Sequence, residues 1–188
     1  MSLGRPNYAL MRTRTAPALP RIEPVVPTLR PAPFNDPAWL FEPKYDGFRG
    51  LVYLTGGRCT IYSKRGNKFS RFRQLEARLC GAFPKRGVIL DGEVVAFGPD
   101  GRVSFWHLMR GEGTLGYVAF DILWLRGKDL RQLPLIERKK RLKRLLPEAG
   151  ARSTSSPGLT RMAASCSKRR ASTISRDSGQ AEGGSLRG

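Results

Sequence analysis

The fold of this chain is constrained above all by short apolar runs that are separated by glycine-containing turns. Residues 51–54 and 59–62 are two such runs, and the Gly56-Gly57 pair between them predicts a β-hairpin. Further strands are predicted at residues 39–41, 88–90, 94–97 and 117–125. Short turns suit antiparallel strands, since parallel strands need a longer crossover connection.

Two segments with helical spacing of apolar residues accompany these strands. Residues 72–82 repeat their apolar side chains at Phe72, Leu75 and Leu79. Residues 135–146 carry Arg and Lys on one face, and on the other face the apolar residues Ile136, Leu142, Leu145 and Leu146. We therefore predict an α+β fold with a largely antiparallel sheet and flanking helices.

Composition divides the 188 residues into three parts. Residues 1–24 are rich in proline and are predicted to form an irregular arm, and the stretch 22–29 is expected to pack on the domain surface. Residues 25–150 hold the predicted strands and helices and form the predicted domain. Residues 151–188 contain no Phe, Tyr or Trp and are predicted to be a disordered tail.

The formal net charge of +19 predicts a polyanionic partner, with nucleic acid as the first candidate and an anionic membrane surface as the second. Residues 151–188 hold seven Lys or Arg and two Asp or Glu, so a basic tail explains only part of the charge. The three cysteines lack a Cys-x-x-Cys pattern, which favours neither disulfides nor a zinc site. With no secretory signal and no long apolar run, we expect a cytoplasmic protein without a membrane partner.

The stretch Glu42-Pro43-Lys44-Tyr45-Asp46-Gly47-Phe48-Arg49 is the first candidate for chemistry. An Asp-Gly pair is a strong turn signal, so we expect Lys44 at the end of a strand beside a tight turn. Desolvation and nearby positive charge would leave its amine unprotonated and nucleophilic. The alternative is an ordinary solvated lysine next to a turn.

Three other segments stand out. In Leu90-Asp91-Gly92-Glu93, a carboxylate beside a buried strand is either a ligand for a hard cation or an exposed residue of a hairpin. Phe120 lies in an apolar strand, where an aromatic residue usually belongs to the core. The loop Ser63-Lys64-Arg65-Gly66-Asn67 is basic.

Taken in order, these segments resemble motifs I, III and IIIa of the covalent nucleotidyltransferases, together with the basic loop of that family. The run Leu133-Pro134-Leu135-Ile136-Glu137-Arg138-Lys139 is similar to one found in bacterial ATP-dependent DNA ligases. The resemblance covers about residues 25–148. It implies an adenylation domain of two antiparallel sheets with flanking helices, which holds ATP between them.

The resemblance also implies a role for each residue. Lys44 would attack the α-phosphate of ATP and carry AMP, with Glu42 beside the adenine and Arg49 on the ribose or a phosphate. AMP would then pass to the 5′-phosphate of a nick in double-stranded DNA, in repair, replication or recombination. A nucleoid-associated protein is the corresponding expectation.

For the remaining positions, the resemblance implies that Glu93 contacts the metal or the sugar and that Phe120 stacks on the adenine ring. Mg²⁺ would offset phosphate charge during each transfer. The family has Ser-Arg where this chain has Ser63-Lys64-Arg65, so either Lys64 or Arg65 would reach the nucleotide.

The family's later motifs IV, V and VI are not found after Pro147, so we expect an adenylation domain truncated on its C-terminal side. Two alternatives to an active DNA ligase stay open. One is an inactive basic fragment that binds nucleic acid, and the other is an RNA ligase or capping-type nucleotidyltransferase. A shift of reading frame near residue 150 would explain the change in composition there, and the coding DNA tests that hypothesis.

Overall fold

The computed structural model describes residues 18–146, apart from 26–27, 29–31, 33, 35, 37–38 and 84–86. The predicted tail at 151–188 lies outside the described residues, as does most of the N-terminal arm. The elements in chain order are β1 (Phe48–Thr55), β2 (Arg58–Ser63), the 3₁₀ helix η1 (Ser70–Phe72), α1 (Arg73–Ala82), β3 (Val88–Phe97), α2 (Phe105–Arg110), β4 (Thr114–Leu125), β5 (Lys128–Asp129) and α3 (Leu135–Leu145).

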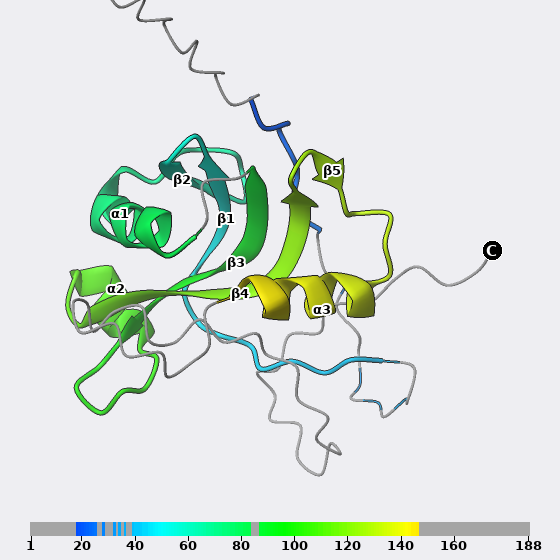
Figure 1. Cartoon of the computed structure of the whole chain (residues 1–188). Helices are drawn as coiled ribbons and strands as arrows, with labels where there is room; N and C mark the ends of the chain where they lie inside the picture. The colour runs from blue at the N-terminus through cyan, green and yellow to red at the C-terminus, as the bar shows by residue number, and fades with distance from the viewer. Residues whose placement is uncertain are drawn as a thin grey trace, which may run out of the picture.

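The strands form a curled antiparallel sheet in the order β2-β1-β3-β4-β5, with α1 on the β2 side and α3 beside β4 (Figure 1). The predicted α+β fold is therefore confirmed. The hairpin of β1 and β2 also forms as predicted, because Gly56 and Gly57 both take the positive φ that its tight turn requires (56° and 77°). Helices α1 and α3 match the segments with helical spacing.

Two predictions about Asp-Gly pairs were wrong. Strand β3 runs unbroken through Asp91-Gly92-Glu93, where we expected a break between two strands. Residues 40–46 belong to no helix or strand, so Lys44 precedes β1 and does not end an earlier strand. Both glycines are needed for space: a Cβ on Gly47 would lie 2.1 Å from the Val94 carbonyl oxygen, and one on Gly92 would lie 2.6 Å from the Tyr117 ring.

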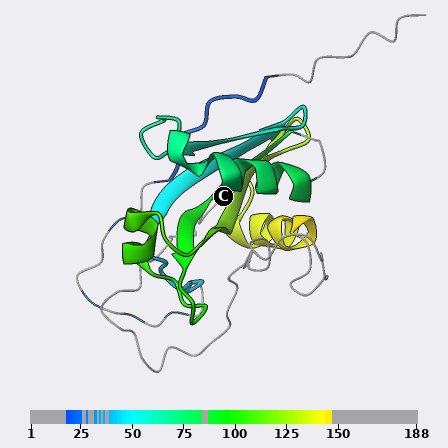
Figure 2. The same ribbon diagram turned by 90° about the vertical axis from the view of Figure 1, so that its left-hand side faces the viewer.

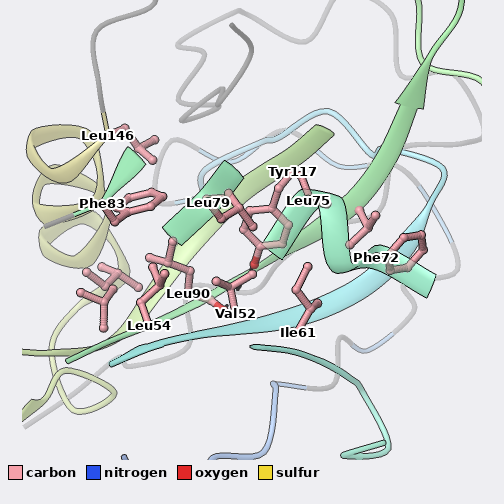
Figure 3. Close-up of a cluster of buried hydrophobic side chains, with 14 of the residues drawn as sticks. Val52, Leu54, Ile61, Phe72, Leu75, Leu79, Phe83, Leu90, Tyr117 and Leu146 are labelled. Carbon is pink, nitrogen blue, oxygen red and sulfur yellow. Dashed lines mark hydrogen bonds between the residues drawn. The ribbon is translucent and has the colours of Figure 1, made fainter. Parts of the chain in front are cut away.

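The main core fills the side of the sheet that faces α1 and α3 (Figures 2 and 3). Tyr117 is at its centre, and its hydroxyl donates a hydrogen bond of 2.8 Å to the Gly50 carbonyl. Helix α3 contributes Leu142 to this core, but Ile136, which we predicted on the apolar face, is 46% exposed. Its outward direction follows from the helix phase, which turns Lys139 inward instead.

A second apolar cluster lies on the opposite side of the sheet, which we call the open face. Ile22 packs there against Leu51, Ile89 and Leu123. The Ile22 backbone N–H donates to the Tyr53 hydroxyl at 2.9 Å. The expected packing of the 22–29 stretch is thus confirmed at Ile22, and this segment covers one end of the open face. None of the helices in the described residues is long and apolar enough to span a membrane.

Candidate nucleotide site

The other end of the open face is polar, and strand register gathers its residues. Arg49 of β1 lies opposite Glu93 of β3. Glu93 in turn lies opposite Val118 of β4. Side chains alternate along a strand, so Asp91, two residues from Glu93, projects to the same face. A cation and two carboxylates from distant parts of the sequence therefore lie side by side.

Arg49 and Asp91 form a bidentate pair. The Arg49 Nε donates to Asp91 Oδ1 at 3.1 Å, and Nη2 donates to Oδ2 at 2.7 Å. The Asp91 side chain is only 2% exposed. Burial raises the pKa of Asp91, and the bonds from Arg49 oppose that rise. Because Nε and Nη2 already donate to Asp91, Arg49 has fewer N–H donors for a ligand than the sequence suggested.

Glu93 differs from Asp91 because the described residues give it no side-chain ion pair. Burial raises its pKa to about 7. The charges of Arg49 and Lys44 and a hydrogen bond from the Gly47 backbone oppose this rise, while Asp91 adds to it. Glu93 is therefore a carboxyl group that changes charge near neutral pH.

Phe120 lies in a β-bulge of strand β4. Asp91 pairs with Asp121 and Gly92 pairs with Ala119, which leaves Phe120 as the extra residue of β4. Its ring is half-buried, and the Arg49 guanidinium carbon lies 5.5 Å from the ring centroid. An aromatic ring of β4 therefore lies beside Arg49 at the polar end of the open face.

Lys44 reaches this region from the irregular segment before β1. Its side chain is 46% exposed and its Nζ lies 2.7 Å from Asp46 Oδ1. It is also close enough to Glu93 to act on that carboxyl group electrostatically. The side chain is thus more exposed than the desolvated amine that we expected, and the carboxylates of Asp46 and Glu93 lie near it.

Two basic residues of helix α3 bind residues of the site and of strand β4. The Lys139 ammonium donates to the Glu42 carboxylate and to the Phe120 carbonyl, and both side chains of this ion pair are buried. The neighbouring Arg138 pairs with Asp121 at 2.9 Å. Two consecutive residues of α3 therefore bind two consecutive residues of β4, Phe120 and Asp121.

Sequence reasoning missed the parts played by Asp91, Asp121, Arg138 and Lys139. One signal was available for Lys139, which comes four residues after Leu135 and three before the buried Leu142, on the inward stripe of α3. The basic run around it suggested a solvated face instead. The Arg49–Asp91 and Arg138–Asp121 pairs depend on register and carry no local signal.

Lys64 and Arg65 lie in the exposed turn after β2. Register puts Ser63 opposite Gly50, so this turn is at the same end of the sheet as Glu93. The turn is closed by its own hydrogen bonds, such as the one from the Gly66 N–H to the Ser63 carbonyl at 2.8 Å. The structure thus brings the basic loop to this end of the sheet.

Among the described residues, no group of three or more His, Cys, Asp or Glu side chains could hold a metal ion by itself. Asp91 is engaged by Arg49, which leaves Glu93 as the carboxylate of the open face best suited to a hard cation. A single carboxylate fits a Mg²⁺ ion that takes its other ligands from phosphates and water.

An antiparallel sheet whose open face combines a lysine, paired charges and an aromatic ring is suited to a nucleotide. The model of the ATP-dependent DNA ligase domain matches residues 28–165. Because this match covers more than half of the sequence, the chain belongs to the ATP-dependent DNA ligase domain family.

Individual relatives agree with this family. The multifunctional non-homologous end joining protein LigD of Mycolicibacterium smegmatis is 34% identical over 125 residues, which make up 63% of this chain and 16% of that protein. DNA ligase C2 of the same organism is 31% identical over 157 residues, or 76% of this chain and 44% of that protein. The chain thus spans less than half the length of these relatives.

Solved structures show the same architecture. A mycobacterial DNA ligase D in complex with ATP and MES superposes with a TM-score of 0.53 at 32% identity. The match covers 57% of this chain and 36% of that one. The ligase domain of LigD from M. tuberculosis gives the same values. The curled antiparallel sheet with few helices is therefore the fold of this family.

Proposed function

We propose that residues 25–150 form the adenylation domain of an ATP-dependent DNA ligase and that Lys44 is its nucleophile. The observation that carries this proposal is the convergence at one end of the open face. Lys44 and Arg49, Asp91 and Glu93, and the Phe120 ring come from three separate parts of the sequence and meet there. Family membership supplies the reaction class.

In the proposed step, the Lys44 amine attacks the α-phosphorus of ATP. A phosphorus–nitrogen bond forms as the bond to the pyrophosphate oxygen breaks, which gives AMP-lysine and pyrophosphate. The amine must lose a proton first, and the Asp46 carboxylate lies within hydrogen-bond reach at 2.7 Å.

Other residues would bind and orient the nucleotide. The adenine would stack on Phe120 with Glu42 beside it, an arrangement supported by the link from both residues to Lys139. Lys64 or Arg65 would contact a phosphate, and Arg49 would offer its remaining N–H donors to the ribose or a phosphate. Glu93 would hold Mg²⁺, which when bound offsets phosphate charge.

The acceptor would be DNA. AMP would pass to the 5′-phosphate of a nick in duplex DNA, and the 3′-hydroxyl would displace it to seal the strand. The net charge of +19 supports a polyanionic substrate and an association with the nucleoid.

The test is the formation of the covalent adduct. The purified chain is incubated with ATP and Mg²⁺ and its intact mass is measured. We expect the mass to rise by that of one AMP in the wild type and not in Lys44→Ala. Lys128→Ala is the matched control, because Lys128 is exposed on β5, where it pairs with Leu125 at the last position of β4.

The same experiment separates the proposal from a basic protein that only binds nucleic acid. Such a protein would bind DNA with strong salt dependence and form no adduct. An adduct that persists in Lys44→Ala would disprove the assignment of the nucleophile. If the adduct forms, sealing of a nicked duplex by the same sample tests the DNA step.

A further inference from the structure

Lys139 is a buried cation that joins two segments far apart in the sequence. It donates to the carboxylate of Glu42, 97 residues away, and to the carbonyl of Phe120, 19 residues away. Its side chain is 5% exposed and that of Glu42 is 8% exposed. A lysine is almost never buried this deeply unless it is paired, so the ion pair is what allows α3 to place a charge here.

The segment that this pair holds has no regular secondary structure. Residues 40–46 belong to no helix or strand, so no ladder of backbone hydrogen bonds orders them. Glu42 lies two residues before Lys44. On the other side, the Phe120 carbonyl belongs to the β-bulge whose aromatic ring faces Arg49. One ammonium group therefore sets the distance between the Lys44 segment and the aromatic ring.

The charges around Glu42 make it dependent on Lys139. Burial raises the pKa of Glu42, and the ammonium of Lys139 opposes that rise. Asp121 of β4 also faces Glu42 and raises its pKa, although Asp121 is itself paired with Arg138 of α3. Without Lys139, burial would act with less opposition, and Glu42 would take up a proton at a higher pH.

We propose that Lys139 is a positioning residue for nucleotidyl transfer. It holds Glu42 and the Phe120 backbone, and so keeps the Lys44 amine and the base-stacking ring of Phe120 in the relative position that the reaction needs. This inference rests on the proposed function. Lys139 acts through Glu42 and Phe120 and is not itself placed on the nucleotide. Displacement of reacting groups by about 1 Å can lower a rate about 100-fold. Loss of the two Lys139 contacts should therefore lower the rate of nucleotidyl transfer.

The experiment compares Lys139→Met with Lys140→Met in the full chain. Lys140 is the adjacent residue, is 55% exposed and pairs with Glu137 on the helix surface. The rate of AMP-lysine formation is measured over a range of ATP concentrations and pH. We expect kcat/KM to fall about 10- to 100-fold in Lys139→Met and to stay within about twofold of wild type in Lys140→Met.

A pH profile separates positioning from a general loss of stability. Lys139→Met should gain an ionisation in kcat/KM that wild type lacks in the same range, because Glu42 then becomes neutral at a higher pH. The added substitution Glu42→Gln should remove that ionisation. If Lys139→Met does not fold, Lys139→Gln takes its place, since the amide keeps a donor for the Phe120 carbonyl and lacks the charge.

The outcomes are distinct. A wild-type chain that forms no adduct contradicts the proposed function and this inference with it. A wild-type chain that forms the adduct, with Lys139→Met and Lys140→Met equally active, overturns the inference alone. A lower kcat/KM without the new ionisation would show that the charge on Lys139 does not position Glu42.

Discussion

Replacing Glu93 with glutamine should stabilise the protein, and more so as the pH rises. Burial raises the pKa of Glu93 from 4.5 to about 7, so the folded protein binds a proton there more tightly than the unfolded chain does. Between these two values the folded state holds more protons, and the free energy of unfolding therefore falls with rising pH. Glutamine has the same size and does not ionise, so the variant avoids this loss.

The magnitude follows from the shift in pKa. At about 1.4 kcal/mol for each pH unit, the interval from 4.5 to about 7 corresponds to about 3 kcal/mol. Glu93 is only partly buried, and solvent screening reduces this contribution. We expect Glu93→Gln to gain about 1–2 kcal/mol relative to wild type between pH 5 and pH 8, with no further gain above pH 8.

The assay is urea unfolding of both proteins at pH 5, 6, 7 and 8, followed by tryptophan fluorescence. The slopes with denaturant should agree, which shows that the two proteins expose similar surface on unfolding. Glu112→Gln is the control, because it makes the same chemical change at an exposed position. A Glu93→Gln difference that does not change with pH would refute the argument that burial keeps this carboxyl group protonated.

Two further predictions concern the sheet beneath the site. Tyr117→Phe should lower the free energy of unfolding by about 1–2 kcal/mol in urea at pH 7, because the Gly50 carbonyl loses its hydrogen bond from the buried hydroxyl; an unchanged value would mean that this bond adds nothing. Gly92→Ala should cost about 2–3 kcal/mol, since its Cβ would lie 2.4 Å from the Val118 carbonyl oxygen. Gly57→Ala, at a turn with open space around it, is the comparison for packing, and its cost should come from its positive φ alone.

The sequence by itself determined the features that depend on neighbouring residues. The Gly56-Gly57 turn fixes the first hairpin, and apolar periodicity fixes α1 and α3, because these signals act within a few residues. The order of the segments around Lys44, Glu93 and Phe120 also pointed to a nucleotidyltransferase, and the chain does belong to a ligase family. The roles of the individual residues stay predictions.

The tertiary structure decided how the charges are paired and where the aromatic ring points. Arg49 meets Asp91 through strand register, and the ring of Phe120, in the bulge of β4, lies beside Arg49. Lys139 looked like one more cation on a basic helix until the fold put it against Glu42. Such contacts join residues up to 97 positions apart, and local patterns carry no record of them. For the same reason, Gly92 signals a turn in the sequence and serves a close approach of strands in the fold.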